Sequence, residues 1–196
     1  MIRAPVKHCM GRRLHGWDYK GRGIYMITVV VAGRRPLLGR LVKRGGAWEV
    51  EETPLGREVA RVWLDLPRLW PGVDVKLHQV MPDHFHGMLY VREAQPKPLG
   101  NIIASFKARI SSYYLAASGE AQNFASFAPG RSRPGFGDMP GASSAPGRSR
   151  PGLWEPGFVD LVLKRRGQLE SMAAYVRDNP RRLGVKRENP PHPARC

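Results

Sequence analysis

Cysteines are scarce in this sequence, and long apolar runs are missing. Cys9 and Cys196 are the two cysteines in 196 residues, and one pair near opposite ends gives no disulfide framework of the kind that small secreted domains use. The longest apolar run, Ile24–Ala32, is far shorter than the roughly 20 residues that a helix needs to cross a bilayer. No basic-then-apolar signal peptide precedes it. We therefore expect a cytoplasmic protein with no membrane partner.

Acidic side chains are few compared with basic ones. Asp and Glu number 16 against 32 Lys and Arg, which gives a formal net charge of +16. Such an excess repels itself unless a polyanion neutralises it, and nucleic acid is the usual polyanion for a basic domain. An anionic membrane surface and a general bias toward arginine are the alternative interpretations. Apolar residues make up 42% of the chain, enough for a real core, so wholesale disorder is not expected.

Composition divides the chain into one domain and three segments without a clear core pattern. They are a basic N-terminal segment (1–23), the domain itself (24–118 and 153–183), an insertion (119–152) and a tail (184–196). The insertion is expected to be flexible because it is dense in Gly and Pro and contains APGRSRPG twice, at 128–135 and 145–152. Two copies are too few for a solenoid. The tail is expected to be disordered.

Apolar periodicity predicts strands interleaved with helices. Thr53-Pro54 is a good helix start, and Gly45-Gly46 predicts a hairpin. On the helix that Pro98 opens, Tyr113 falls on the apolar stripe and Tyr114 faces elsewhere, free to stack on a base. Strands are predicted at 24–31, 37–43, 47–50, 73–81, 85–91 and 153–164, and helices from 53 to about 70, from 98 to about 114, and over 168–178, where Pro180 ends the last helix.

His84-Phe85-His86 lies at the start of a probable central strand. Residues two apart on a strand point to the same side, so both imidazoles can bind one metal ion while Phe85 packs into the opposite face. Two surface histidines near a turn are the alternative interpretation. Polar side chains on a central strand need a reason, and that context favours a metal site.

Tyr175 and Asn179 are four residues apart, so they share one face of the predicted helix. A phenol can act as a nucleophile when a metal or cation stabilises the phenolate, and an Asn carbonyl oxygen can join the metal. A half-buried packing residue and a helix C-cap are the alternatives for these two positions. Tyr113 and Tyr114 are competing candidates for the nucleophile because they too follow the histidine pair on a helix.

Four blocks in this order resemble the REP-associated tyrosine transposases. They are MPDHFHG (81–87), the Phe106-Lys107 pair, LWEPGFVDLVLK (153–164) and YVRDNP (175–180). These proteins belong to the HUH superfamily of single-strand DNA transposases and nucleases, which includes the IS200-like transposases. The resemblance implies an α+β fold, a ferredoxin-like sandwich with a central antiparallel sheet and helices packed on it.

The resemblance also implies roles for single residues. His84 and His86 match the metal-binding pair, Tyr175 the nucleophile, and Asn179 a position where related transposases place a third, amide-type ligand. Asp160 and Lys164 match supporting positions, although the family often has Arg at the latter. Two further departures are Leu161, where a His is common, and Asp83, where an Asn is usual.

The function implied is that of a single-strand DNA endonuclease and strand-transferase that acts on hairpin, REP-like DNA. A divalent ion, Mg²⁺ or Mn²⁺, assists Tyr175 in forming a 5′-phosphotyrosine intermediate. The candidate DNA contacts are Lys107, Arg109, Tyr114, Arg177, Arg181 and Arg182. A non-catalytic, domesticated binder of structured nucleic acid is the main alternative; a metal-dependent hydrolase that uses water and a generic basic scaffold are two others. Monomer and homodimer are both open.

Overall fold

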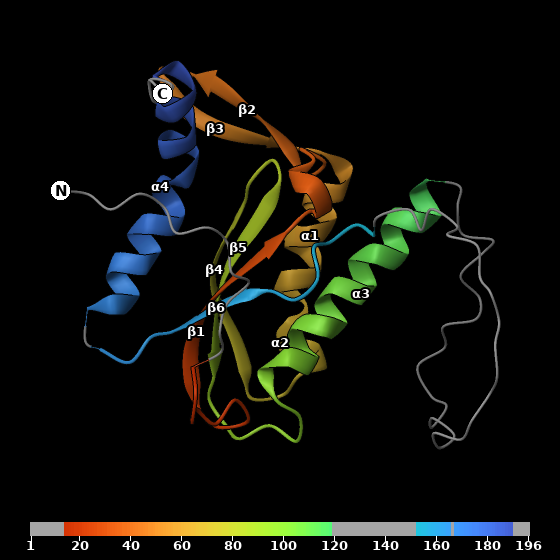
Figure 1. Cartoon of the computed structure of the whole chain (residues 1–196), viewed down its shortest axis with the longest axis vertical. Coiled ribbons are helices and arrows are strands. Elements are labelled where there is room, and N and C mark those ends of the chain that lie inside the picture. Colours follow the sequence, from red (N-terminus) through yellow and green to blue (C-terminus); the bar gives the residue numbers. More distant parts are fainter. Residues whose placement is uncertain (1–13, 119–151, 166, 190–196) are drawn as a thin grey trace, which may run out of the picture.

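The computed structural model describes residues 14–118, 152–165 and 167–189. A central antiparallel sheet has two long helices on one face and a third on the other, with a separate two-stranded hairpin at one end (Figure 1). In chain order the elements are β1 (Gly23–Val30), η1 (Ala32–Arg34), β2 (Gly39–Arg44), β3 (Ala47–Glu52), α1 (Pro54–Leu64), α2 (Leu66–Leu69), β4 (Val73–Val80), β5 (His84–Val91), α3 (Leu99–Ala117), β6 (Val159–Val162) and α4 (Gln168–Glu188).

The sheet has the strand order β4-β5-β1-β6, and all its neighbouring strands are antiparallel. Apart from the β2–β3 hairpin, the order of elements up to β6 is β-α-β-β-α-β, which is the ferredoxin-like arrangement. The predicted fold class is therefore confirmed. α4 follows this unit and covers the sheet face that α1 and α3 leave open (Figure 1).

The core lies between the sheet and the α1–α3 layer. Alternate β1 residues, Tyr25, Ile27 and Val29, are fully buried there because successive strand side chains point to opposite faces. Trp63 of α1 packs its ring against Phe85 of β5, with centroids 5.1 Å apart. Gly87 permits this contact, since a Cβ at that position would overlap the Trp63 ring.

Local signals in the sequence correctly place the hairpin and the first helix. Gly45 and Gly46 turn the chain between β2 and β3 with φ of 55° and 83°, values that favour glycine. The Thr53 side chain caps α1 by accepting a hydrogen bond from the Gly56 N–H at 3.1 Å. The strand predicted over 153–164 is shorter, being confined to β6, with an isolated bridge between Val31 and Trp154 before it.

The last helix is longer than predicted. α4 runs through Pro180 to Glu188, so the expected stop before Pro180 is wrong, as is the expectation of disorder for residues 184–188. An interior proline costs a helix about 3 kcal/mol, and the β2–β3 hairpin offsets that cost. Trp48 packs directly on Gly184, and Lys43 pairs with Glu188 at 2.9 Å. Residues 190–196, the N-terminal residues 1–13 and the repeat-bearing 119–151 lie outside the described residues.

The two tyrosines of α3 have exchanged roles relative to the prediction. Tyr113 is 38% exposed, whereas Tyr114 packs against the core. The stripe that includes Phe106 and Ile110 continues by a step of four to Tyr114 rather than by a step of three, and both steps keep residues on one helix face. Within the described residues, no helix has the length and apolarity to cross a membrane.

Candidate active site

Strand alternation brings the two histidines together at the start of β5. Phe85 points into the core and is fully buried, while His84 and His86 lie on the opposite face, toward α4. The Nε2 atoms of the two imidazoles are 3.1 Å apart, and the rings stand nearly perpendicular with centroids 4.7 Å apart. The predicted arrangement of the pair on one face is present.

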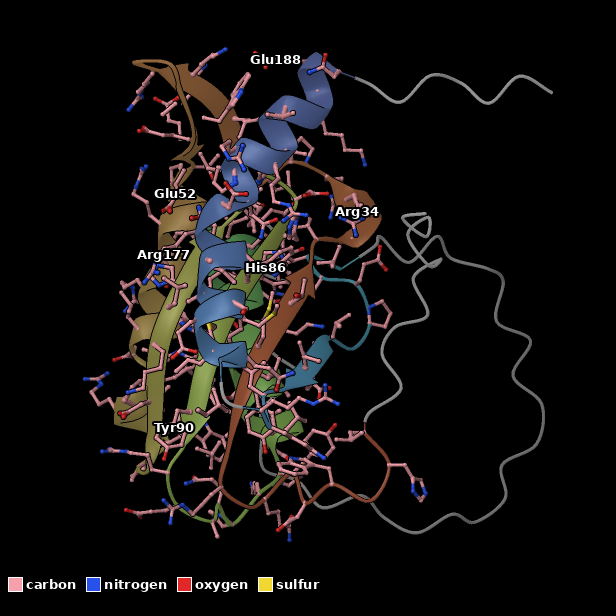
Figure 2. All side chains as sticks on the ribbon, turned by 90° about the vertical axis from the view of Figure 1, so that its left-hand side faces the viewer. Arg34, Glu52, His86, Tyr90, Arg177 and Glu188 are labelled. Atoms are coloured by element: carbon pink, nitrogen blue, oxygen red, sulfur yellow. The ribbon has the colours of Figure 1, made fainter. Side chains whose placement is uncertain are left out.

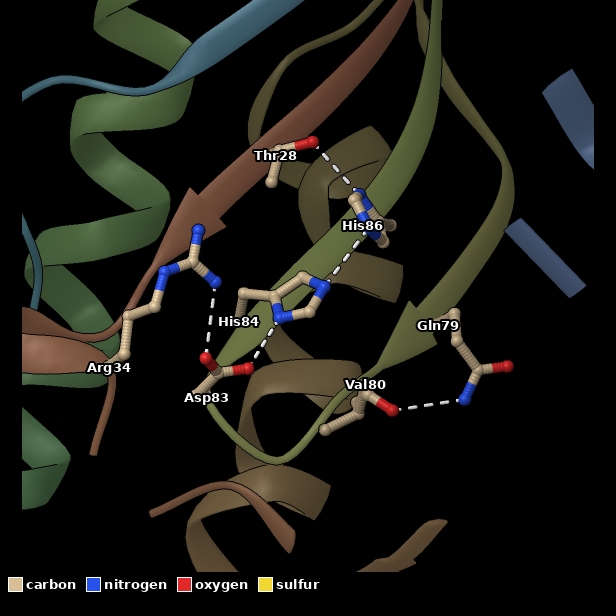
Figure 3. Close-up of polar contacts among 7 residues, drawn as sticks. All are labelled: Thr28, Arg34, Gln79, Val80, Asp83, His84 and His86. Atoms are coloured by element: carbon tan, nitrogen blue, oxygen red, sulfur yellow. Dashed lines mark hydrogen bonds and ion pairs between the residues drawn. The ribbon is translucent and has the colours of Figure 1, made fainter. Parts of the chain in front are cut away.

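Each histidine is oriented through its other ring nitrogen (Figure 3). His84 Nδ1 lies 2.6 Å from Asp83 Oδ1, and His86 Nδ1 lies 2.9 Å from Thr28 Oγ1 on β1. Arg34 in turn donates to Asp83 Oδ2 at 3.1 Å. Partners of this kind fix the tautomer and direction of a metal-binding imidazole. Sequence reasoning missed Thr28 and Arg34; a hydroxyl within the otherwise apolar run of β1 was the signal for Thr28.

Burial keeps His86 neutral. The residue is 5% exposed, and burial, reinforced by the nearby charges of His84 and Arg34, lowers the pKa of His86 to about 3. Burial raises the pKa of Asp83, but hydrogen bonds and ion pairs from His84 and Arg34 outweigh it and leave that pKa below its usual value. A neutral imidazole beside a carboxylate-bound imidazole retains the lone pair that a metal ion needs.

The donor set fits a divalent cation. The two Nε2 atoms, 3.1 Å apart and within hydrogen-bond distance of each other, are close enough for one cation to contact both. Among the described residues, no cluster of three or more His, Cys, Asp or Glu side chains forms a metal site. His84 and His86 would therefore share the ion with other ligands, such as an amide oxygen, water or a phosphate.

Tyr175 lies beside this pair. α4 passes in front of the sheet at the level of His86 (Figure 2), and the ring centroids of Tyr175 and His86 are 5.9 Å apart. The Arg182 guanidinium, two helical turns further on, stands over the Tyr175 ring at 5.1 Å. Tyr113 and Tyr114 are on α3, on the other side of the sheet (Figure 1), so Tyr175 is the tyrosine that the fold brings to the histidines.

Asn179 occupies the next turn of α4 and is buried, with 9% of its surface exposed. Its Nδ2 donates to the Tyr175 carbonyl at 3.0 Å. This hydrogen bond takes up the amide nitrogen, so the amide oxygen is the donor atom that suits a cation. Its role as a third ligand stays a prediction.

The structure does not bring the two supporting candidates to the histidines. Asp160 pairs in register with the buried Ile27 of β1 and accepts a hydrogen bond from the Tyr19 hydroxyl at 2.8 Å. Paired residues of an antiparallel ladder share a face, so Asp160 faces away from His86. The Lys164 ammonium lies over the Trp17 ring at 4.3 Å. Both residues hold the segment that precedes β1.

The candidate DNA contacts separate into two groups. Lys107, Arg109 and Tyr114 lie on α3, behind the sheet; Lys107 donates to the carbonyls of Glu155 and Gly157, each at 2.8 Å, and Arg109 pairs with Asp65. Burial lowers the pKa of Lys107. Arg177, Arg181 and Arg182 lie on α4 and are exposed, with Arg181 paired to Asp178. Of the second group, Arg182 is the one that stands over the Tyr175 ring.

Comparisons with known proteins point to the same fold. No family model matches the chain. An uncharacterized protein of Haemophilus influenzae is 23% identical over 130 residues, which span 56% of this chain and 70% of that protein. Among the solved structures that match are the following two. One is a REP-associated tyrosine transposase bound to a REP hairpin, with a TM-score of 0.54 and 15% identity over 89% of this chain and 75% of that chain. The other is a putative transposase from Deinococcus radiodurans, with a TM-score of 0.44 and 14% identity over 86% and 97% of the two chains. The first likeness shows that this chain has a transposase-like fold.

Proposed function

We propose that this protein is a single-strand DNA endonuclease and strand-transferase that acts on hairpin DNA, with Tyr175 as its nucleophile. The observation that carries this proposal is the placement of the Tyr175 ring 5.9 Å from the ring of His86, on the sheet face that also carries His84. A phenol, two converging imidazoles and nearby arginines form a set suited to attack on a phosphodiester.

The phenolic oxygen of Tyr175 loses its proton and attacks the scissile phosphorus in line, forming an O–P bond to the phosphate that stays on the 5′ end of the downstream strand. The O3′–P bond breaks at the same centre, and the departing 3′ oxygen takes up a proton. A later 3′-hydroxyl attacks the phosphotyrosine and rejoins the strands, so the energy of the phosphodiester is conserved. The Arg182 guanidinium stands over the Tyr175 ring and is a cation that can pair with the phosphate.

His84 and His86 would hold a divalent ion, Mg²⁺ or Mn²⁺, and imidazole ligands favour the softer Mn²⁺. The ion would supply charge neutralisation at the phosphate. Asp83 and Thr28 orient the two imidazoles through their Nδ1 atoms, and Arg34 holds Asp83 in place.

DNA is the proposed partner. The formal charge of +16 suits a polyanion, α4 carries exposed arginines, of which Arg182 lies over the Tyr175 ring, and the similar REP-associated tyrosine transposase was solved with a REP hairpin. A hairpin with single-stranded flanks is therefore the first substrate to test.

Covalent capture tests the proposal. The protein is incubated with labelled hairpin oligonucleotides and Mn²⁺, and adducts that survive SDS are counted. We expect an adduct in the parent and in the control Tyr114→Phe, and none in Tyr175→Phe. Tight binding without any adduct would support a non-catalytic nucleic-acid binder, and cleavage that persists in Tyr175→Phe would support a hydrolase that uses water; either result overturns the proposal.

A further inference from the structure

A pocket opens beside Tyr175, between the sheet and α4. α4 lies over β4 and β5, so the β1–β6 side of the same sheet face has less helical cover. The pocket has a volume of about 240 Å³. It is lined by Met26 and Thr28 of β1, Val159 and Leu161 of β6, and Met172 and Tyr175 of α4.

The lining is apolar although the pocket borders a polar site. Four of its six residues carry only aliphatic or thioether side chains, and the Thr28 hydroxyl is already bonded to His86 Nδ1. Leu161 leaves 44% of its surface exposed. Apolar hollows next to a few fixed polar groups are typical of ligand sites.

Two residues belong to both the pocket and the candidate active site. Tyr175 forms one wall and contacts the His86 ring, and Thr28 lines the same hollow while it orients His86. Arg182 stands over the Tyr175 ring. The pocket therefore suits an occupant with an apolar part in the hollow and an attached anion that can reach Arg182 beside Tyr175.

We infer that this pocket receives the unpaired nucleobase next to the phosphodiester that Tyr175 attacks. The inference rests on the proposed function and deepens it by naming the part of the DNA that the pocket binds. A nucleotide joins an apolar ring to a phosphate within one residue, which matches an apolar pocket beside a cationic site. Base faces stack on aromatic and apolar side chains, and methionine adapts its shape to flat ligands.

Two properties of recognition follow from the lining. A base in a duplex is held in its stack, so the pocket admits an unpaired base and favours single-stranded flanks. Reading of base edges needs hydrogen-bonding groups, and the Thr28 hydroxyl is engaged with His86. The pocket therefore binds the faces of a base and tolerates its identity, with stacking and size as the main determinants.

The test uses a DNA hairpin with oligo-dT flanks in which a single abasic site is moved one position at a time. Binding is measured by fluorescence anisotropy with the Tyr175→Phe protein, which keeps the ring and cannot form the adduct. Loss of one stacked base lowers affinity by about tenfold, so we expect one position in the scan at which the abasic site has this effect.

The variant Leu161→Asn identifies the pocket as the place where that base lies. We expect Leu161→Asn to weaken binding of intact DNA and to remove the penalty of the abasic site, because the two changes delete one contact. Leu64→Asn is the matched control, since Leu64 is an exposed leucine of α1 on the other side of the sheet. It should bind intact and abasic DNA like the parent.

Two outcomes overturn the inference. One is a scan without a sensitive position, and the other is a loss of affinity at the abasic site that is equal with and without Leu161→Asn in the Tyr175→Phe protein. The adduct assay on the wild-type chain reports separately on the proposed function. Adduct formation without coupling between Leu161 and a base would support Tyr175 as the nucleophile and contradict base binding in the pocket. Coupling without an adduct would support base binding in the pocket and contradict the proposed chemistry.

Discussion

The two faces of the central sheet differ in what they carry. The face under α1 and α3 is a close-packed aromatic and aliphatic core, in which Trp63, Phe85 and Phe106 contact one another edge to face or tilted. The face under α4 carries a polar row across three strands, with Thr28, His86 and Gln79 paired in register. Strand alternation therefore separates the groups that form the core from the groups to which we assign the proposed chemistry.

The two faces of the sheet also differ in how much of them the helices cover. α1 and α3 contact each other and enclose the core, whereas α4 crosses the other face alone and leaves a pocket beside Tyr175. α4 packs on β4 and β5 of the sheet and on β3 of the hairpin, where Trp48 contacts Gly184. The face under α4 thus keeps an open pocket beside Tyr175, and the face under α1 and α3 is closely packed.

Substitutions of two neighbouring residues on β5, one on each face of the sheet, should have the largest and most different effects. Phe85→Ala empties a fully buried ring site and should lower the free energy of unfolding by about 3–5 kcal/mol. His86→Ala should leave a folded protein and reduce metal-dependent DNA cleavage by roughly 100-fold or more, because it removes a proposed ligand. Urea denaturation and adduct formation measure the two effects. Similar profiles for the two variants would contradict the division between the faces.

The pH dependence of stability tests the buried imidazole. Burial lowers the pKa of His86 from 6.5 to about 3, so below pH 6.5 the unfolded chain binds a proton that the folded chain does not. The free energy of unfolding, measured in EDTA, should then fall by about 1.4 kcal/mol per pH unit below 6.5, or about 2 kcal/mol by pH 5.

His86→Gln should flatten this dependence. His78, whose pKa burial also lowers, contributes in the same direction and remains in both proteins, so the comparison isolates His86. An equal pH slope in parent and variant would show that His86 is protonated in the folded state.

Much of this division could be predicted from the sequence because it depends on short-range patterns. The alternation in His84-Phe85-His86 assigns the residues to opposite faces once a strand is assumed, and both assignments hold. The Thr53 cap and the Gly45-Gly46 turn are equally local signals. The encounter of Tyr175 with the histidines came from a family resemblance, not from a pattern.

The remaining features depend on contacts distant in the sequence. Arg34 reaches Asp83 because Gly33 and Arg34 both adopt left-handed φ values, 65° and 51°, which no local pattern specifies. α4 continues past Pro180 because a hairpin more than a hundred residues earlier packs on it. Lys107 and Asp160 have charged side chains typical of a functional site, yet their partners are backbone carbonyls and the Tyr19 hydroxyl.

The variant Asp83→Asn tests whether Asp83 orients His84 for metal binding on the face under α4. The carboxylate of Asp83 orients the His84 ring through Nδ1, so the neutral amide should weaken Mn²⁺ binding by about tenfold. Calorimetric titration of the metal alone measures this change without DNA. Asp74→Asn is the control, because Asp74 of β4 pairs with Lys76 on the same strand and with Arg92, which follows β5. Equal losses in both variants would point to a general effect of charge rather than to orientation of His84.

The smallest expected effect distinguishes the cations of the two faces. Arg182→Gln removes an exposed charge over the Tyr175 ring. The slope of log affinity against log salt is negative, and on single-stranded DNA this variant should make it shallower by about 0.7, the contribution of one phosphate contact. Lys107→Gln should leave that slope unchanged, because its ammonium is bonded to Glu155 and Gly157 behind the sheet. It should instead lower the free energy of unfolding by about 1–3 kcal/mol, since two carbonyls lose their donor. A change of slope in Lys107→Gln that matches the change in Arg182→Gln would mean that DNA contacts both faces, and the separation of packing from chemistry would then fail for the charged residues.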